Sequence, residues 1–466
     1  MRNLLTKLFI VLLALSIVAC KPSTKTKDTN DCCPKPAALL KSVANYPEWS
    51  NDATIYEVNI RQYTPEGTFA AFEKQLPRLK ELGVEILWIM PINPISEKNR
   101  KGSLGSYYAS QDYKKVNPEF GTLADFKSLV SKAHELGFKV IVDWVANHTG
   151  WDNEWITKHP DWYTTDSTGK IISPVPDWTD VADLNYDNKD MRAAMIDALQ
   201  YWVKEADIDG YRCDVAGMIP VDFWDEARAS LDKIKPVYML AEDEGEKGLL
   251  VKAFNMNYGW EFHHIMNQVA QGKAGAAEVK AYFAKIDTIY PEGSYPMQFT
   301  SNHDENSWNG TEYERMGDAA KTMAALTFVM PGMPLIYTGQ EVGNNKRIKF
   351  FDKDQIEWAN PAMQEFYSKL IGIKKANKAL WNGAAGAPAH FLHTGQENSL
   401  LVVDRAVEGN KVIAIFNLSK DPVTNTVECP RIAGNYLNAI TGEKVTYEKG
   451  QSFTLKPWEY MILIAE

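Results

Sequence analysis

The chain has 466 residues, of which 45% are hydrophobic and 24% charged, and its formal net charge is -10. This length exceeds what one compact domain usually holds, so we expect a large domain and at least one smaller domain. The negative charge removes any electrostatic reason to bind nucleic acid or anionic lipid, whereas a neutral polar substrate is compatible with it. The five cysteines show no spacing typical of a zinc site or of a disulfide framework.

The N-terminus predicts export from the cytoplasm. Two basic residues precede an apolar run over 8–19 that is too short to span a bilayer, so we predict a signal peptide over residues 1–19. The run ends in IVAC, which resembles the bacterial lipobox and implies diacylation of Cys20; an ordinary signal peptide that ends near a cysteine is the alternative. Acyl chains contribute roughly 0.8 kcal/mol per buried methylene. We therefore expect an exported, membrane-anchored bacterial lipoprotein on the periplasmic face or at the cell surface.

Residues 20–47 are rich in Lys, Thr, Pro and Asp, which predicts a flexible tether. Beyond them, short β-rich runs alternate with amphipathic helical patterns, as is typical of βαβ units around a parallel sheet. The strand-like runs lie at 54–60, 86–92, 139–145, 210–214, 237–242, around Trp260, and at 297–304 and 334–341. The helical patterns lie at 72–83, 123–137 and 190–206. The approach to eight strands favours a closed barrel, so we predict an α/β fold, a (β/α)8 TIM barrel, over residues 48–382.

One connection interrupts this alternation. About forty residues rich in Trp, Asp, Pro and Thr follow the run at 139–145, and we predict an inserted subdomain over 146–188 that walls the active site. Past residue 382 the helical pattern stops, and β-rich runs at 399–407, 411–419 and 460–466 alternate with turns. We therefore predict a separate all-β sandwich domain over 383–466.

Three carboxylic acids end strand-like runs of the predicted barrel: Asp214, Glu242 and Asp304. The carboxyl ends of parallel barrel strands meet at one face, so these side chains are expected to converge on one pocket. Two carboxyl groups can together cleave a glycosidic bond, because one attacks the anomeric carbon while the other protonates the leaving oxygen. The pattern predicts a glycoside hydrolase.

Seven short segments resemble, in the same order, the motifs of the α-amylase superfamily of retaining α-glucoside enzymes. The four main segments are DWVANH (143–148), GYRCD (210–214), MLAE (239–242) and NHD (302–304), and the others lie at 106–122, 182–185 and 332–341. The resemblance covers about residues 48–466. It implies a TIM barrel with a short inserted domain after the third strand and a C-terminal β-sandwich domain that packs on the barrel. A starch-binding module at the C-terminus is the alternative.

The resemblance implies a role for each matched residue. Asp214 matches the nucleophile, Glu242 the general acid and base, and Asp304 the third carboxylate, which grips sugar hydroxyls. Five more match groups that bind the sugar or order the pocket: Tyr108, Asp143, His148, Arg212 and His303. Arg212 precedes Asp214 by two residues on one strand face, so we expect the pKa of Asp214 to stay low. The pKa of Glu242 should rise toward neutrality, because this group must begin protonated.

The resemblance also leaves a calcium cofactor open. Asn147 and Asp183 match calcium ligands that tie the inserted domain to the barrel, but Ca²⁺ takes about six to eight oxygen donors and two matches do not define a site. Met218 stands where many relatives have a histidine that gives its backbone carbonyl.

The expected activity is endo-acting cleavage of α-1,4-glucosidic bonds in starch-like glucans or maltooligosaccharides, by a retaining double displacement. The alternatives are an exo-acting α-glucosidase or maltogenic enzyme, an α-glucanotransferase, and a non-catalytic glucan-binding lipoprotein. The three intact acids disfavour the last of these. Tyr107 stands where many relatives have glycine, which predicts a reshaped non-reducing side of the pocket. We expect a monomer that binds no nucleic acid.

Overall fold

The computed structural model describes residues 41–358, 361–426 and 428–466. The predicted signal peptide, Cys20 and most of the predicted tether lie outside the described residues. Within the described ranges, no helix has the length and apolar character needed to cross a membrane. Two cysteines, Cys213 and Cys429, are free thiols, and Cys213 is buried as expected for a barrel strand.

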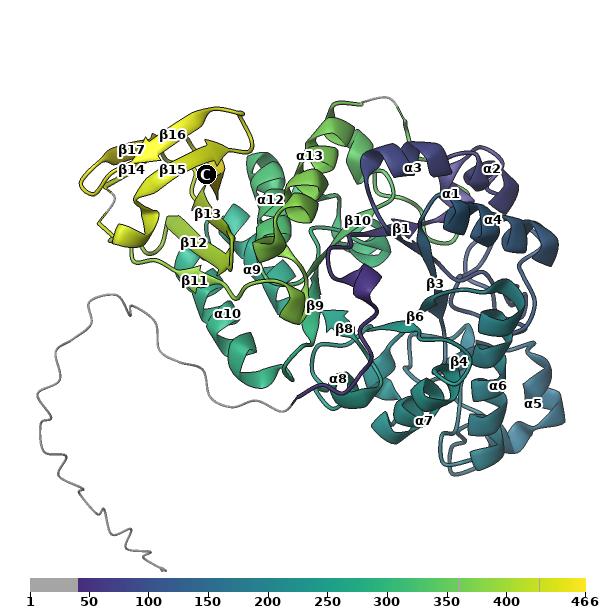
Figure 1. Ribbon diagram of the computed structural model, residues 1–466. Coiled ribbons are helices and arrows are strands. Elements are labelled where there is room, and N and C mark those ends of the chain that lie inside the picture. Colours follow the sequence, from purple (N-terminus) through teal and green to yellow (C-terminus); the bar gives the residue numbers. More distant parts are fainter. Residues whose placement is uncertain (1–40, 359–360, 427) are drawn as a thin grey trace, which may run out of the picture. The chain divides into compact units, whose positions relative to one another are not determined.

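In the described part of the chain, eight parallel strands close into a barrel, which confirms the predicted TIM barrel (Figure 1). The order around the barrel is β1-β10-β9-β8-β7-β6-β3-β2. The strands are β1 (Ile55–Val58), β2 (Ile86–Ile89), β3 (Lys139–Trp144), β6 (Gly210–Cys213), β7 (Tyr238–Ala241), β8 (Met256–Tyr258), β9 (Tyr295–Gln298) and β10 (Met333–Tyr337).

Helices pack on the outside of this barrel (Figure 1). The longer ones are α3 (Leu76–Leu82), α4 (Leu123–Glu135), α6 (Lys189–Ala206), α7 (Val221–Leu231), α9 (Trp260–Ala270), α10 (Ala276–Ile289), α12 (Ala320–Val329) and α13 (Ala362–Ala376). The short ones are α1 (Ile60–Tyr63), α2 (Phe69–Glu73), α5 (Glu154–Lys158), α8 (Leu249–Lys252) and α11 (Glu312–Met316). The helical pattern predicted over 72–83 divides between α2 and α3, because Pro77 has no N–H to donate and is tolerated only in the first turn of a helix.

Two of the predicted strands differ most from the structure. The run expected over 297–304 is strand only as far as Gln298, and Asp304 directly precedes a short π-helix over Glu305–Asn309. The run expected around Trp260 is β8, which ends at Tyr258, and Trp260 begins α9.

The period of two along the strands decides which side chains enter the barrel. Ile55, Ile141 and Leu240 belong to the inner core, whereas their neighbours Tyr56, Val140 and Met239 pack against the helices outside. The same alternation turns three charged residues inward: Glu57, Asp143 and Arg212. The register then places Asp143 of β3 directly beside Arg212 of β6. A charged cluster inside the barrel therefore follows from sequence spacing and strand register.

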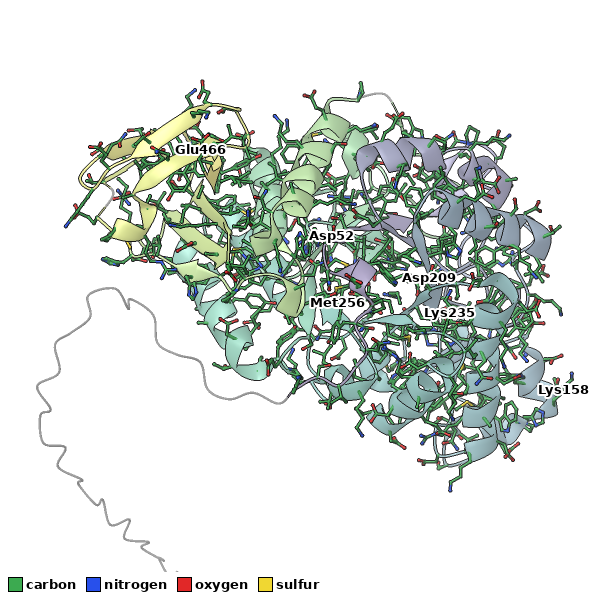
Figure 2. The ribbon with its side chains drawn as sticks, in the orientation of Figure 1. Asp52, Lys158, Asp209, Lys235, Met256 and Glu466 are labelled. Carbon is green, nitrogen blue, oxygen red and sulfur yellow. The ribbon has the colours of Figure 1, made fainter. Side chains whose placement is uncertain are left out.

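The start of β6 is fixed from both sides. Buried Asp209 accepts a hydrogen bond from the backbone N–H of Val140 (2.9 Å) and lies 3.3 Å from the Lys235 ammonium nitrogen (Figure 2). A Cβ on Gly210 would lie 1.8 Å from the carbonyl oxygen of Tyr238, so only glycine permits this approach of β6 to β7. This end of the barrel sets the register of the strand that leads to Asp214.

The segment over 146–188 contains a small antiparallel pair, β4 (His148–Gly150) and β5 (Val181–Asp183). Lys101, in the connection after β2, reaches this segment. Its ammonium group lies 3.0 Å from the Asp180 carboxylate and donates a hydrogen bond to the carbonyl of Asp177 (2.8 Å). The insertion is thereby tied to a loop at the C-terminal face of the barrel.

The C-terminal part is all β, as predicted. One antiparallel sheet contains β11 (His390–Phe391), β12 (Leu400–Val407), β13 (Asn410–Asn417), β18 (Tyr460–Ala465), β15 (Gly434–Asn438) and β16 (Lys444–Tyr447). A two-stranded sheet of β14 (Val423–Thr426) and β17 (Ser452–Leu455) shares its hydrophobic core. Buried Arg405 donates hydrogen bonds to the carbonyls of Val329, Trp381 and Ala387, which joins β12 to the end of α12. The exact domain boundaries predicted from the sequence stay predictions.

Candidate active site

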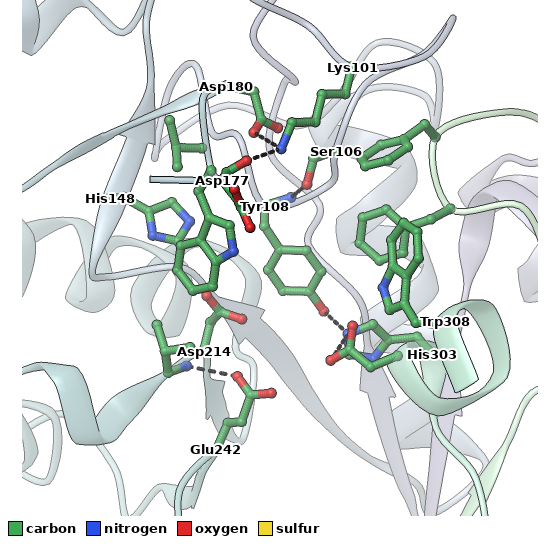
Figure 3. A pocket seen from close by; sticks show the side chains of 16 residues that line it. Lys101, Ser106, Tyr108, His148, Asp177, Asp180, Asp214, Glu242, His303 and Trp308 are labelled. Carbon is green, nitrogen blue, oxygen red and sulfur yellow. Dashed lines mark hydrogen bonds and ion pairs between the residues drawn. The ribbon is translucent and has the colours of Figure 1, made fainter. Parts of the chain in front are cut away.

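A cavity of about 620 Å³ lies at the C-terminal ends of the barrel strands (Figure 3). Six of the eight predicted catalytic and sugar-binding residues line it: Tyr108, His148, Asp214, Glu242, His303 and Asp304. The remaining two, Asp143 and Arg212, are fully buried and contact the lining residues. Cavities of about 300–1,000 Å³ hold drug-sized ligands, which corresponds to a few sugar rings. The sequence therefore identified residues that do converge on one site, while their chemical roles stay predictions.

The centre of the site is the guanidinium group of Arg212. Its Nη1 lies 2.9 Å from Oδ1 of Asp143 and 2.9 Å from Oδ1 of Asp214, and its Nη2 lies 2.9 Å from Oε1 of Glu242. The Nε–H donates to the hydroxyl of Tyr258 (3.1 Å). The single positive charge of this fully buried guanidinium is thus shared among three carboxyl groups.

This shortage of positive charge is visible in the pKa values. Burial raises the pKa of Glu242 to about 7, against the pull of Arg212 and with further upward contributions from Asp214 and Asp304. The rise toward neutrality expected for Glu242 is confirmed. The expectation that Asp214 keeps a low pKa is wrong: burial raises its pKa to about 6, because Arg212 is divided among three acids and offsets only part of the desolvation.

Asp143 connects the two sides of the pocket. Its Oδ2 accepts hydrogen bonds from the indole N–H of Trp88 (3.1 Å) and from the hydroxyl of Tyr108 (3.0 Å), while Oδ1 faces Arg212. The Tyr108 hydroxyl is also 2.8 Å from Nε2 of His303, and the two rings stack with centroids 5.4 Å apart. The positions of Tyr108 and His303 are therefore set by a buried carboxylate.

Glu57, on β1, is a site residue that the sequence reasoning missed. It is fully buried, and its Oε1 lies 2.5 Å from Nδ1 of His303, whose Nε2 lies 3.3 Å from Asp304. Burial alone lowers the pKa of His303, but Asp304 and Glu57 raise it to about 9. A usable signal was present in the sequence: Glu57 is a charged residue within an apolar strand, at a position that faces inward.

Val215 is a second residue that the sequence did not reveal. Its φ is 38°, in the left-handed region, where a β-branched side chain is strained. This turn directs the Val215 N–H to Oε2 of Glu242, at 2.8 Å. The strained residue immediately after Asp214 thereby orients Glu242, whose side chain is 13% exposed.

His148 and Trp178 form the wall of the pocket on the side of the insertion. The two rings lie 5.5 Å apart in an edge-to-face arrangement. Burial lowers the pKa of His148 to about 4, so its imidazole is neutral at physiological pH. A neutral ring that donates one hydrogen bond suits contact with a sugar hydroxyl.

The two predicted calcium ligands lie together. The amide Nδ2 of Asn147 is 3.4 Å from Oδ1 of Asp183, and both residues line a separate cavity of about 270 Å³, as does Met218. Burial raises the pKa of Asp183, and hydrogen bonds from Thr164 and Asn147, but no cationic side chain among the described residues, counter this effect. Among the residues described, no three His, Cys, Asp or Glu side chains gather as a metal site. The pair fits calcium where main-chain carbonyls and water complete the oxygen shell.

Comparison with known proteins places this geometry among carbohydrate-active enzymes. The family model described as "Alpha amylase, catalytic domain" matches residues 44–171 and 175–410. The alpha-amylase MalA of Haloarcula japonica is 27% identical over 398 residues, which are 81% of this chain and 57% of that protein. The chain thus spans little more than half the length of that relative.

Two solved structures are similar over most of their length. An alpha-amylase from Lactobacillus plantarum shares 32% identity, with a TM-score of 0.79 and coverage of 89% of this chain and 99% of that chain. A noncanonic maltogenic alpha-amylase from Thermotoga neapolitana shares 29% identity, with a TM-score of 0.81 and coverage of 89% and 98%.

We predict that Glu57→Gln lowers the pKa of His303 from about 9 toward its ordinary value, because one of its two carboxylate partners is lost. A folded-state pKa above the unfolded value of 6.5 stabilises the protein below pH 6.5, and this contribution is lost as the pH rises through about 9. The Glu57→Gln variant should lose part of this stabilising contribution. NMR titration of the His303 ring, assigned with His303→Gln, measures the pKa directly. Glu312→Gln, which removes another buried carboxylate, is the matched control, and an unchanged His303 titration in Glu57→Gln would contradict the assignment.

Proposed function

The chain belongs to the alpha-amylase catalytic-domain family of glycoside hydrolases, and we propose that within it this protein is an endo-acting, retaining enzyme on α-1,4-linked glucans. The observation that carries the proposal is the placement of Asp214 and Glu242 on two nitrogens of one buried guanidinium, with Asp304 lining the same cavity. Starch-like polymers and maltooligosaccharides are the proposed substrates. They are neutral, which suits a chain of net charge -10.

The proposed mechanism uses two displacements. Asp214 attacks the anomeric carbon while Glu242 gives its proton to the glycosidic oxygen, so that the bond to the leaving sugar breaks and an ester to Asp214 forms. Glu242 then accepts a proton from water as that water attacks the anomeric carbon, which breaks the ester and regenerates both acids. Asp304, with 34% of its side chain exposed into the cavity, holds sugar hydroxyls.

Exo-acting release of a single small product and transfer to a sugar acceptor are the alternatives within the family. The similarity to a maltogenic alpha-amylase is the observation that supports the exo-acting alternative. A time course of products from amylose, pullulan and maltoheptaose, with the anomeric configuration followed by proton NMR, separates the cases. Mixed α-configured maltooligosaccharides from amylose support the proposal. A single small product would indicate an exo-enzyme, and longer oligosaccharides would indicate a transferase. No reaction would indicate a binding protein.

Substitution of the two catalytic carboxyls should separate their roles. We predict that Asp214→Asn lowers turnover by roughly three orders of magnitude or more while glucan binding persists, because covalent catalysis is lost. Glu242→Gln should impair starch hydrolysis far more than the first step with α-glucosyl fluoride, whose leaving group needs no proton. Pre-steady-state fluoride release measures that step. Equal losses on both substrates would exclude Glu242 as the acid, and about a tenth of normal activity in Asp214→Asn would exclude Asp214 as the nucleophile.

The pH dependence follows from the same roles. We predict that kcat/KM on maltoheptaose rises as Asp214 ionises near pH 6 and falls as Glu242 loses its proton near pH 7, giving a narrow maximum between them. The steady-state rate at low substrate across pH 4–9 measures both limbs. With α-glucosyl fluoride the alkaline limb should weaken, because no proton is required. An alkaline limb that is equally steep with both substrates would contradict the assignment of that limb to Glu242.

We further propose that Asn147 and Asp183 contribute to a calcium site that stiffens the inserted segment. The support is their proximity and the absence of a cationic partner near Asp183 within the described ranges. Removal of calcium by a chelator should lower Tm, and re-addition should restore it. Asp183→Asn should abolish this calcium dependence, and Asp318→Asn, which removes an exposed carboxylate outside that cavity, serves for comparison. A Tm that does not respond to calcium in the unmodified protein would refute the site.

Finally, we propose that the protein is exported and anchored through acylated Cys20, on the strength of the apolar run and the IVAC pattern alone. Detergent-phase partitioning and mass spectrometry of the N-terminal peptide test this proposal. A Cys20→Ala variant that partitions exactly like the original chain would refute the anchor.

A further inference from the structure

Among the described residues, Trp308 is one of the few large apolar residues that are exposed to solvent, with 52% of its surface accessible. A single exposed apolar residue is ordinary on a protein surface. Trp308, however, lines the cavity that holds the three acids, together with Phe350 and Phe351. An exposed indole face that lines this pocket is therefore a candidate surface for binding a ligand.

The three aromatic side chains are held in place by their backbone. Trp308 belongs to the π-helix that follows Asp304, and its ring centroid lies 5.2 Å from that of Phe350 and 5.7 Å from that of Phe351. Asn306 accepts a hydrogen bond from the N–H of Ile348 (2.8 Å), and Ser307 donates to the carbonyl of the same residue (2.8 Å). These bonds join the π-helix to the segment that carries the two phenylalanines. We call Trp308, Phe350 and Phe351 the aromatic wall.

The aromatic wall continues the stack of rings that begins inside the pocket. His303 stacks on Tyr108, and Tyr108 lies nearly parallel to Phe350, with centroids 6.1 Å apart and an interplanar angle of 17°. Trp308 then packs against Phe350 at the outer end (Figure 3). Flat ring faces of this kind bind the apolar C–H faces of sugar rings.

The position of Glu242 decides which part of a glucan chain reaches this wall. Glu242 and Asp214 lie on one side of the pocket, whereas Trp308 lies on another side, beside His303 (Figure 3). In the proposed function Glu242 protonates the oxygen of the departing sugar, so the departing part of the chain lies on the Glu242 side. The part that stays bound to Asp214 extends toward the aromatic wall. This step rests on the proposed function.

We propose that Trp308, backed by Phe350 and Phe351, stacks on an α-linked glucose residue on the non-reducing side of the cleaved bond, beyond the ring that Asp214 attacks. The wall thereby selects for substrates with at least one further glucose unit on that side. It also helps to set the length of the product released from the covalent intermediate.

The test compares substrates that reach the wall with one that does not. Trp308→Ala should lower kcat/KM for maltoheptaose about tenfold relative to kcat/KM for α-glucosyl fluoride, which carries a single ring. Its cleavage pattern on end-labelled maltoheptaose should shift toward shorter non-reducing-end products. Trp308→Phe, which keeps an aromatic face, should recover most of the maltoheptaose activity.

Trp358→Ala is the matched control. Trp358 is 37% exposed, its indole N–H donates to the carbonyl of Tyr63 (2.9 Å), and it does not line the cavity. The Trp358→Ala variant should leave the ratio of kcat/KM for maltoheptaose to kcat/KM for α-glucosyl fluoride unchanged. Equal losses of Trp308→Ala on both substrates, or no loss on either, would overturn the inference. An unmodified protein inactive on every α-glucan would instead overturn the proposed function.

Discussion

The protonation of the catalytic carboxyl groups depends on how the buried Arg212 cation is shared among three acids. The Arg212 guanidinium contacts Asp143, Asp214 and Glu242, each at 2.9 Å. Removing several charges from water costs on the order of several kcal/mol per ion, and one guanidinium cannot offset three carboxylates. Burial therefore raises the pKa of Asp214 to about 6 and of Glu242 to about 7, so both carboxyl groups keep their protons to higher pH than they would in water. Desolvation thus keeps one carboxyl protonated beside another that is ionised, as acid and nucleophile require.

A second buried pair stabilises the opposite wall of the pocket. Glu57 holds His303 as an imidazolium, with a pKa of about 9, next to Asp304. Positive charge at His303 complements the carboxylate of Asp304, while Tyr108 connects this wall to Asp143 and so to Arg212. The acids are therefore not independent. A change in Asp143 reaches Asp214 or Glu242 through two contacts, by way of Arg212, and a change in Glu57 reaches Asp304 through two contacts, by way of His303.

Much of this arrangement could be predicted from the sequence, because it depends on local period and spacing. Alternating strand and helix patterns indicated the barrel, and the two-residue separation of Arg212 and Asp214 placed both on one strand face. The remaining features depend on tertiary burial. The raised pKa of Asp214 depends on the number of acids around Arg212, which is set by the register between strands. The charge of Glu57 within an apolar strand can be read from the sequence, but its ion pair with His303, 246 residues away, cannot. The strain at Val215 likewise has no local signature.

The barrel separates the charges that stabilise it from those that react. At the start of β6, buried Asp209 is contacted by His134, Lys139 and Lys235. The hydrogen bonds from His134 and from the Val140 N–H, together with the charge of Lys235, lower the pKa of Asp209 despite burial. At the end of the same strand, Asp214 shares a single cation, and burial raises its pKa. Four residues of strand thus join an aspartate that has two lysine partners to one that shares a single guanidinium. A fold can retain an electrostatically unfavourable active site when the same strands are secured at their other end, which is the division expected of TIM barrels.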